Sequence, residues 1–313
     1  MAGTVKPARL SFGDTIAVVA PSGTPSPRSL NLGLSRFRQL GLNAYIHPQC
    51  FNKRGYLAGD DKIRAEALMD VFSDKRFKAV LCARGGFGCQ RLLKHLDIDI
   101  IKKRPKIFVG YSDITILLQA FNIDGFVTFH GPMPAIDLKR RNYQYSLRNF
   151  LQVTTETEAI GKLRNPPRLG PFRKLRPGKA AGVLTGGNLS LLDKLVGTPY
   201  MPSFKGKIVF LEDVDEDPYR LDGYLSHLFY ATDISEASGF ILGQLVNCRI
   251  TKRASPSLTL AQVLDDYFGL LKVPVLGNVA CGHGKEILTM PLGVKTKIDA
   301  DNGSIEIMES AVR

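Results

Sequence analysis

Short apolar runs alternate with amphipathic stretches along the first half of the chain. Apolar runs of strand length lie at 15–22, 43–48, 78–84, 106–110 and 126–132. Between residues 60 and 72, apolar side chains recur at Ile63, Ala67, Leu68 and Val71, as they do on one face of a helix. Short apolar strands separated by helices are typical of a parallel sheet covered on both faces. The first half therefore predicts a Rossmann-like α/β domain.

The pattern changes in the middle of the chain. Residues 152–179 hold four prolines, several basic residues and no sustained periodicity, which predicts a linker. Strand-like runs return at 181–189, 206–213, 239–245 and 273–279. Residues 295–307 predict a hairpin with an Asn-Gly turn. We therefore expect an N-terminal parallel-sheet domain over 1–151 and a C-terminal α/β domain of mixed or antiparallel strands over 180–313.

Composition and charge narrow the class of protein. No apolar run reaches the roughly 18 residues of a membrane-spanning helix, and the N-terminus lacks a secretory signal, so we expect a cytoplasmic protein. The five cysteines are scattered without a C-x-x-C pair, which argues against a disulfide framework or structural zinc. The 42 basic and 29 acidic residues give a net charge of +13. Because the basic residues are mostly dispersed and no nucleic-acid-binding motif is present, the charge favours a small acidic substrate over nucleic acid.

A serine occupies the corner between a predicted strand and a predicted helix. The stretch G-Y-S-D-I, with Ser112 at its centre, matches four of five positions of the nucleophile elbow G-x-S-x-G, and only Ile114 departs from it. Such a corner exposes the serine oxygen and aims a helix N-terminus at developing negative charge. The alternative is a helix N-cap, which is the commonest role of a serine at this place.

A nucleophilic serine needs a base, and the base needs an orienting acid. His283 lies between two glycines after a predicted strand, whereas His130, also at a strand end, is its main rival. Glu212 is the first charged residue after another apolar strand. Ser112, Glu212 and His283 then follow a known order of triad residues along the chain. The acidic residues after Glu212 lack calcium-loop spacing and are better explained as a solvated loop, so no metal is expected.

A glycine-rich loop, R-G-G-F-G, follows the third predicted strand at 84–88. It lacks the third glycine of a dinucleotide-binding fingerprint and the Lys-Ser/Thr of a phosphate loop. Its backbone N–H groups could form an oxyanion hole. A tight turn between strand and helix is the alternative.

Taken together, these segments resemble the LD-carboxypeptidase family of serine peptidases. The resemblance extends over nearly the whole chain, and its specificity comes from the order and spacing of the segments. They are V-A-P-S-G near the start, 55–61, A-R-G-G-F-G at 83–88, G-Y-S-D-I-T at 110–115, T-F-H-G-P at 128–132, T-G-G-N-L at 185–189, F-L-E-D at 210–213 and G-H-G at 282–284.

The resemblance implies roles for individual residues. Ser112 would be the nucleophile, His283 the general base and Glu212 its partner, while the N–H groups of Gly86 and Asp113 would form the oxyanion hole. The family carries the serine on an N-terminal domain and the Glu and His on a C-terminal domain, and usually forms homodimers. No metal or organic cofactor is needed.

The implied reaction releases the terminal D-alanine from a murein tetrapeptide in the cytoplasm, during recycling of the cell wall. The scissile amide joins the L-centre of meso-diaminopimelate to D-alanine. The substrate carries several carboxylates, and Arg84 and Gly85 are the candidates for substrate contacts. Neither nucleic acid nor a membrane is an expected partner.

Two alternatives remain open. The related microcin C immunity peptidases cleave aminoacyl or peptidyl nucleotide analogues and often hold the adenine with a Trp; this chain has none, although Tyr or Phe could substitute. An alternative of another class is a non-catalytic α/β protein that binds a sugar or nucleotide, with Ser112 as a helix cap.

Overall fold

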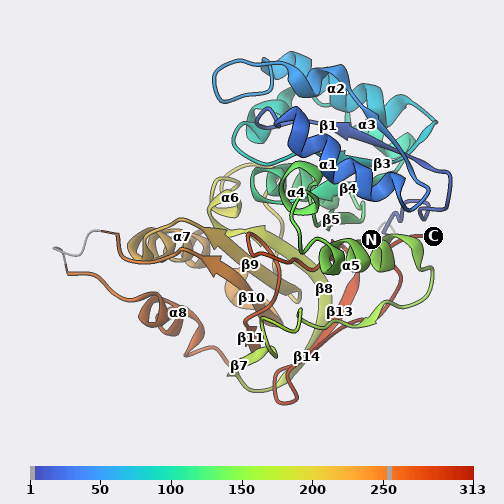
Figure 1. The fold of residues 1–313 in the computed structure, drawn as a ribbon. Coiled ribbons are helices and arrows are strands. Elements are labelled where there is room, and N and C mark those ends of the chain that lie inside the picture. The colour runs from blue at the N-terminus through green and yellow to red at the C-terminus, as the bar shows by residue number, and fades with distance from the viewer. Residues whose placement is uncertain (1–3, 252–255) are drawn as a thin grey trace.

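The computed structural model describes residues 4–251 and 256–313 and contains two sheets, one in each half of the chain (Figure 1). The first sheet has the strand order β12-β5-β4-β3-β1-β2. Its strands are β1 (Thr15–Val19), β2 (Asn43–Ile46), β3 (Phe77–Cys82), β4 (Ile107–Gly110), β5 (Thr128–His130) and β12 (Met290–Leu292). Strands β1 to β5 pair in parallel, which confirms the predicted parallel sheet.

Strand β12 comes from the C-terminal part of the chain and pairs antiparallel with β5, with Met290 opposite His130. The first sheet is therefore completed by a strand that lies more than a hundred residues beyond its other members. The predicted boundary between two domains does not separate their strands completely, because the chain returns to the first sheet before it ends.

Helices cover the first sheet, as the alternating pattern predicted. The helices of this half are α1 (Pro27–Arg38), α2 (Asp61–Ser73), α3 (Ile98–Lys103), α4 (Thr115–Ile123) and α5 (Gln144–Thr155). Helix α2 buries Ala67, Leu68 and Val71, in agreement with the predicted apolar face. Ile63, which was expected on that face, is exposed, whereas the neighbouring Arg64 is fully buried. The apolar face of α2 is therefore rotated away from Ile63, because the Arg64 guanidinium finds acceptors inside the fold.

The second sheet is mixed and has the order β6-β14-β13-β8-β9-β10-β11-β7. Its strands are β6 (Gly161–Lys162), β7 (Arg173–Arg176), β8 (Lys179–Asn188), β9 (Ile208–Val214), β10 (Gly239–Val246), β11 (Val275–Gly277), β13 (Lys295–Asp299) and β14 (Ser304–Ile307). Strands β8 to β11 are parallel, and β13 and β14 form the predicted hairpin. The segment 152–179, expected as a linker, contributes β6 and β7, which are the two edge strands of this sheet and pair with β14 and β11.

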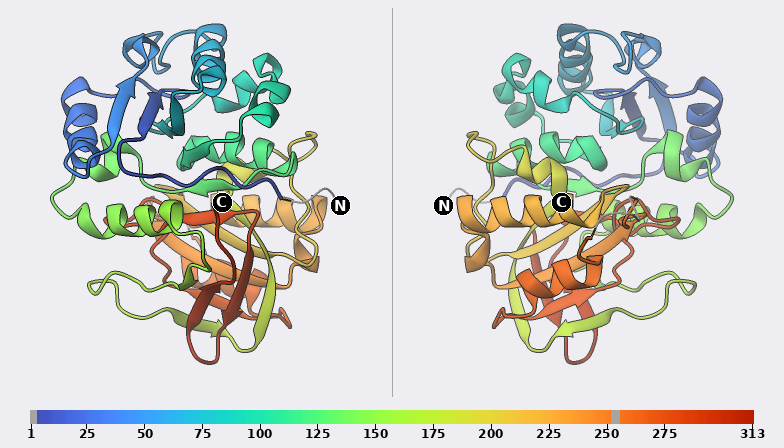
Figure 2. Two further views of the ribbon diagram at one scale, coloured as in Figure 1. Left: turned by 90° about the vertical axis from the view of Figure 1, so that its right-hand side faces the viewer. Right: turned by 90° about the vertical axis from the view of Figure 1, so that its left-hand side faces the viewer.

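Helices α6 (Leu189–Asp193), α7 (Pro218–Ala231) and α8 (Leu260–Phe268) belong to the second half. Figure 2 shows the two halves from two sides, with the blue and cyan elements above the sheet that holds the orange and red strands. In the part of the chain that the structure describes, no helix combines the length and the apolar character that crossing a membrane requires.

Helix α4 connects the two halves because it lies against strand β8. The Gln119 amide donates to the Gly186 carbonyl at 2.6 Å, and the Asn188 N–H donates to the Thr115 hydroxyl at 3.2 Å. Asn188 is in turn paired with Glu212 across β8 and β9. The start of α4 is therefore held one strand away from Glu212.

Candidate active site

The corner between β4 and α4 holds Ser112 in an uncommon backbone conformation. Strand β4 is buried along its length, and Ser112 then has a φ of 63°. A residue with a β-carbon is less stable there by about 1–2 kcal/mol, so the surrounding structure must hold it in place. Neither η3 (Ser112–Ile114) nor α4, both within the described residues, is capped by a side chain at its N-terminus. The helix-cap interpretation of Ser112 thus has no capping hydrogen bond to support it.

Glu212 and His283 meet beside this corner. Glu212 lies on β9 with its side chain fully buried, and His283 Nδ1 donates to its Oε2 at 2.8 Å. His283 belongs to the loop after β11, and 17% of its side chain is exposed. A β-carbon on Gly282 would collide with the Glu212 carboxylate, and Gly282 has a φ of +94°. Only glycine therefore lets the histidine loop approach the carboxylate this closely.

The charges of this pair stabilise each other. Burial by itself would raise the pKa of Glu212, but the nearby His283 outweighs burial and holds that pKa below its ordinary value. Burial would likewise lower the pKa of His283, yet the Glu212 carboxylate raises it above 6.5. An Nδ1–H that donates to a carboxylate leaves Nε2 as the acceptor in the neutral imidazole. This tautomer suits a general base that becomes an imidazolium during the reaction.

Tyr111 and Arg140 connect the histidine loop to the first half of the chain. The Tyr111 ring lies edge-on to the His283 ring, with centroids 5.0 Å apart, and its hydroxyl donates to buried Asp137 at 3.1 Å. Arg140 donates to the Gly284 carbonyl at 2.6 Å and forms an ion pair with Asp137 at 3.4 Å. These contacts orient the loop. The sequence assigned none of the three residues this role, because no local spacing marks a contact with residues more than 140 positions away.

The glycine loop at 84–88 lies against the serine. A β-carbon on Gly85 would come within 2.8 Å of Ser112 Cβ and 3.0 Å of its Oγ. Gly86 has a φ of 140°, a conformation that L-residues rarely adopt, and a β-carbon on it would lie 3.3 Å from the Gly23 nitrogen. The Arg84 Nε donates to the Gly85 carbonyl at 3.1 Å. The structure therefore places Gly85 against Ser112, with Arg84 and Gly86 as its chain neighbours.

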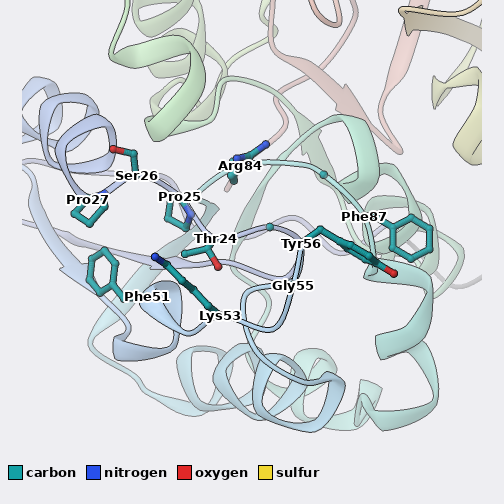
Figure 3. A pocket seen from close by; sticks show the side chains of 12 residues that line it. Thr24, Pro25, Ser26, Pro27, Phe51, Lys53, Gly55, Tyr56, Arg84 and Phe87 are labelled. Carbon is teal, nitrogen blue, oxygen red and sulfur yellow. The ribbon is translucent and has the colours of Figure 1, made fainter.

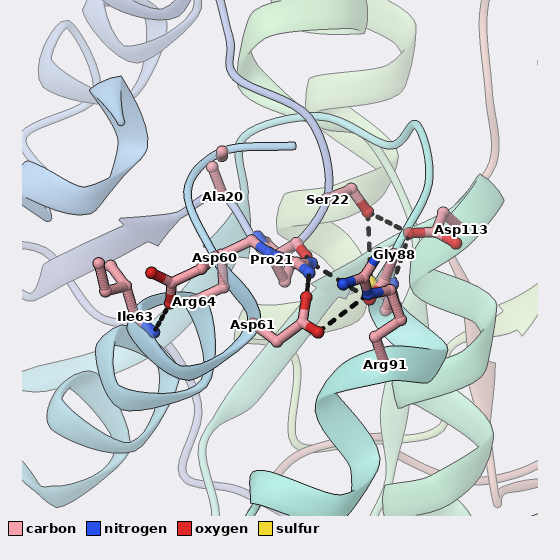
Figure 4. A network of polar contacts seen from close by, with 12 residues as sticks. Ala20, Pro21, Ser22, Asp60, Asp61, Ile63, Arg64, Gly88, Arg91 and Asp113 are labelled. Atoms are coloured by element: carbon pink, nitrogen blue, oxygen red, sulfur yellow. Dashed lines mark hydrogen bonds and ion pairs between the residues drawn. The ribbon is translucent and has the colours of Figure 1, made fainter. Parts of the chain in front are cut away.

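A buried polar network ties this loop to the serine corner (Figure 4). The Asp113 carboxylate, 2% exposed, uses one oxygen to accept both the Ser22 hydroxyl and the Cys89 N–H. Ser22 belongs to the loop after β1 and Cys89 follows the glycine loop. The Asp113 carboxylate therefore connects three chain segments. Asp113 directly follows Ser112, so the same residue also places its backbone N–H next to the serine.

Arg64 also stabilises the glycine loop, through hydrogen bonds to backbone carbonyls (Figure 4). Its fully buried guanidinium donates to the Pro21 and Gly88 carbonyls and pairs with Asp61. A buried guanidinium is costly unless it is paired and hydrogen-bonded, so these partners account for its position. Through Gly88 it fixes the far end of the glycine loop. The sequence did not reveal this residue, because arginine at that helical spacing is typical of a solvated face.

Two cavities adjoin the site. The first, which we call the glycine-loop cavity, has a volume of about 850 Å³ (Figure 3). Its lining includes Gly86 and Arg84 together with Lys53, Tyr56 and Phe87. The Tyr56 and Phe87 rings meet edge to face at 5.7 Å, and both side chains are exposed. This cavity offers cations and aromatic faces next to the glycine loop.

The second cavity, which we call the histidine cavity, measures about 390 Å³ and has His283 in its lining. Gln244, Arg168, Lys285 and Glu286 also line it. Its walls come from the end of β10, the segment between β6 and β7, and the histidine loop. It therefore opens beside the imidazole, whereas the glycine-loop cavity opens beside Gly86.

His130, the rival histidine, is a core residue. It is fully buried against Phe210 and Tyr111, with ring centroids at 4.9 and 5.6 Å. Among the described residues neither of its ring nitrogens has a hydrogen-bond partner. Burial lowers its pKa to about 4, so the ring stays neutral. A histidine without exposed surface does not reach a substrate, which leaves His283 as the base candidate.

The first residue of the acidic stretch after Glu212 is Asp213, and its carboxylate makes hydrogen bonds inside the fold. Asp213 is buried and accepts hydrogen bonds from the Asn188 side chain and the Ser190 N–H. Within residues 4–251 and 256–313, no group of three or more His, Cys, Asp or Glu side chains is arranged to hold a metal ion.

Sequence comparison assigns the family. The sequence profile of the LD-carboxypeptidase N-terminal domain matches residues 16–131, and that of the LD-carboxypeptidase C-terminal domain matches residues 181–298. Together the two matches span well over half of the chain. The protein therefore belongs to the LD-carboxypeptidase family, which confirms the resemblance in its motifs.

Individual relatives agree with this assignment. A probable murein peptide carboxypeptidase of Bacillus subtilis is 40% identical over 296 residues, covering 94% of this chain and 91% of the relative. The structure of the microcin C7 self-immunity protein MccF in its wild-type apo state matches with a TM-score of 0.89 at 26% identity, covering 99% of this chain and 100% of that chain. The muramoyltetrapeptide carboxypeptidase from Oxalobacter formigenes matches with a TM-score of 0.83 at 26% identity, covering 95% and 98%. The two-half α/β fold is thus shared with both kinds of protein.

Proposed function

We propose that the protein is a serine carboxypeptidase in which Ser112, Glu212 and His283 form the catalytic triad. The observation that carries the proposal is the Glu212–His283 hydrogen bond of 2.8 Å, formed beside a serine whose φ is 63°. A buried carboxylate on Nδ1 and a partly exposed imidazole fit an acid that orients a base. Membership of the LD-carboxypeptidase family supports the same assignment.

In the proposed reaction, His283 Nε2 takes the Ser112 proton as Oγ attacks the scissile carbonyl. The N–H groups of Gly86 and Asp113 donate hydrogen bonds to the developing oxyanion. The imidazolium, stabilised by Glu212, then protonates the leaving amine, and an acyl-enzyme forms. Water hydrolyses this intermediate by the same route. Preorganised backbone donors of this kind are each worth roughly 10²–10³-fold in rate, and the buried Asp113 network supports such preorganisation.

The proposed substrate is a murein tetrapeptide, from which the enzyme releases terminal D-alanine in the cytoplasm during cell-wall recycling. The Bacillus subtilis and Oxalobacter formigenes relatives support a murein peptide as substrate. The net charge of +13 favours an anionic peptide, and Arg84 at the edge of the glycine-loop cavity is available for one of its carboxylates. Gly85, packed against Ser112, would contact the peptide backbone. We expect the protein to act as a homodimer.

A second candidate function is cleavage of aminoacyl or peptidyl nucleotide analogues, as in microcin C immunity. Its support is the TM-score of 0.89 to MccF, together with the exposed Tyr56 and Phe87 rings beside the glycine loop. These rings offer a stacking surface in a chain that has no Trp.

The test is release of D-alanine from L-Ala-D-Glu-meso-diaminopimelate-D-Ala. Wild type should release it, Ser112→Ala and His283→Ala should lose at least about 10³-fold in kcat/KM, and His95→Ala, an exposed histidine elsewhere, should match wild type. Equal release by wild type and Ser112→Ala would refute the mechanism and favour a non-catalytic binding protein. Turnover of an aminoacyl sulfamoyl adenylate without release from the tetrapeptide would favour the immunity-type function.

A further inference from the structure

The two cavities beside the candidate site differ in which catalytic group lines them. The glycine-loop cavity has Gly86 in its wall, and the histidine cavity has His283. The Tyr111 ring packs on His283, and Gly85 of the glycine loop lies against Ser112, the residue that follows Tyr111. One cavity therefore lies on the side of the proposed oxyanion donors and the other on the side of the proposed base.

The chemistry of acyl transfer gives these two sides different meanings. The group that protonates the leaving amine must lie next to it, because the same imidazole that takes the serine proton delivers it to the departing nitrogen. The carbonyl oxygen points instead to the backbone donors. The leaving amino acid therefore belongs on the His283 side, and the acyl part of the peptide extends toward the other cavity.

The sizes of the cavities agree with this division. The histidine cavity measures about 390 Å³ and the glycine-loop cavity about 850 Å³. A single terminal amino acid needs less space than the remaining three residues of a tetrapeptide. The smaller cavity suits the leaving residue, and the larger one suits the acyl chain.

The histidine cavity also carries the cations that a terminal carboxylate requires. Arg168 and Lys285 line it, both are exposed, and neither side chain is ion-paired or hydrogen-bonded within the described residues. An arginine can bind a carboxylate through two parallel hydrogen bonds. Glu286 is the one acid in the lining, so basic groups outnumber acidic ones. A free carboxylate is the chemical group that distinguishes a carboxypeptidase substrate from an internal peptide.

We propose that the histidine cavity is the subsite for the leaving amino acid, where Arg168 and Lys285 bind the free C-terminal carboxylate beside His283. The proposal rests on the proposed carboxypeptidase function. The subsite adds to that function the direction in which the peptide lies and the residues that recognise its free C-terminus. Arg84 and Lys53, in the other cavity, are left to the carboxylates of the acyl part.

The experiment compares the tetrapeptide with the same peptide ending in D-alaninamide, which lacks the terminal charge. Wild type should prefer the free acid, and the double variant Arg168→Gln/Lys285→Gln should reduce that preference, as a ratio of kcat/KM values, by at least about 10-fold, mainly through KM. Inhibition by added D-alanine should weaken in parallel. Arg164→Gln is the matched control, because Arg164 is an exposed arginine in the same segment that lines neither cavity.

The outcomes separate the subsite from the function. An unchanged acid-to-amide ratio in the double variant would overturn the subsite, and so would a loss of the preference in Arg84→Gln alone, since the carboxylate would then lie in the glycine-loop cavity. If wild type hydrolyses neither peptide, the proposed function fails instead. Because both substituted side chains are exposed, loss of folding would show as an altered circular dichroism spectrum and a lowered Tm, which the Arg164→Gln control calibrates.

Discussion

Ser112 and His283 reach the site from two regions that are held in different ways. The corner around Ser112 is fixed by its own backbone and by buried groups, chiefly the Asp113 carboxylate and the Arg64 guanidinium. The histidine loop is partly exposed and is held from outside, by Glu212 on one sheet and by Arg140 from the first half of the chain. The proposed nucleophile is thus fixed within one region, whereas the proposed base is positioned by contacts from two regions.

This difference predicts what substitutions in each region change. If the proposed roles hold, a substitution that removes the buried contacts of the corner should displace the proposed oxyanion donors from Ser112 and lower kcat at every pH. A substitution around the loop changes the charge or the orientation of the imidazole, so its effect depends on pH. The four predictions below test this division.

The largest effect is expected from Glu212→Gln. The Glu212 carboxylate raises the pKa of His283 above 6.5, whereas burial alone would lower it. A base works when neutral, so wild-type kcat/KM should rise through a pKa above 6.5. Without the carboxylate, this acidic limb should move to lower pH by about one unit or more, and the maximum should fall by roughly 10²–10⁴-fold, because the tautomer is no longer held.

A pH profile of kcat/KM from pH 5 to 9 measures both effects. Glu306→Gln, a substitution of a half-buried acid on β14, serves as the control and should leave the profile in place. If the acidic limb of Glu212→Gln stays where it is in wild type, the group that titrates is not His283 in contact with Glu212.

The second prediction concerns a substitution in the corner around Ser112. Asp113→Ala removes the acceptor for the Ser22 hydroxyl and the Cys89 N–H, which should lower kcat by about 10–100-fold with little change in KM, since a displacement of about 1 Å can cost that much. Both donors reach the same oxygen of Asp113, so Asp113→Asn can keep both hydrogen bonds through its amide oxygen. The Asn variant should recover at least half of the loss on a logarithmic scale.

Steady-state kinetics with circular dichroism as a folding check measure this pair of variants. The acidic limb should keep its pH in both, in contrast to Glu212→Gln. Equal losses in the Ala and Asn variants would show that the charge of Asp113, and not its hydrogen bonds, matters at the corner.

The sequence predicted those elements around the candidate site that local patterns determine. The strand, turn and helix around Ser112 leave a local signature, and Glu212 and His283 each follow an apolar run that predicts a strand. The hairpin formed by β13 and β14 follows from its Asn-Gly turn. In each case the signal lies within a few residues of the feature, so a single sequence contains it.

The remaining features depend on contacts between distant segments. Arg64 replaces Ile63 inside the fold because the Pro21 and Gly88 carbonyls meet there, and those carbonyls come together only after the loops have folded. Strand β12 joins the first sheet by pairing with β5, and the hydrophobic periodicity of the sequence does not predict this pairing. Arg140 reaches Gly284 across 144 positions. Such contacts leave no local pattern in one sequence.

The third prediction concerns the contact that holds the histidine loop. Arg140→Gln removes the ion pair with Asp137 and weakens the bond to the Gly284 carbonyl, so the imidazole should be less well oriented. We expect kcat to fall by about 3–10-fold. The acidic limb should move to lower pH, because Arg140 lowers the pKa of Asp137, and the Asp137 carboxylate in turn raises the pKa of His283. Arg141→Gln, at the adjacent exposed arginine, is the matched control and should behave as wild type. A loss in Arg140→Gln with an unmoved pH profile would place Arg140 in the overall fold rather than in the orientation of the base.

The smallest effect concerns stability alone and isolates the strain of the corner. Ser112→Ala and Ser112→Gly should both be inactive, but only glycine adopts a φ of 63° without strain. The left-handed conformation is unfavourable by about 1–2 kcal/mol for a residue with a β-carbon, and glycine loses roughly 0.5–1 kcal/mol through its greater freedom in the unfolded chain. Ser112→Gly should therefore unfold with a free energy about 0.5–1 kcal/mol higher than that of Ser112→Ala.

Urea unfolding of the two variants measures this difference, and Ser35→Gly with Ser35→Ala provides the matched pair. Ser35 lies within α1, where glycine has no strain to relieve, so there the glycine variant should be the less stable one by about 1 kcal/mol. The opposite signs at the two serines would show that the corner stores backbone strain, which the buried Asp113 and Arg64 contacts balance. The same sign at both positions would mean that Ser112 sits in the left-handed region without cost, and the difference between corner and loop would then rest on hydrogen bonds alone.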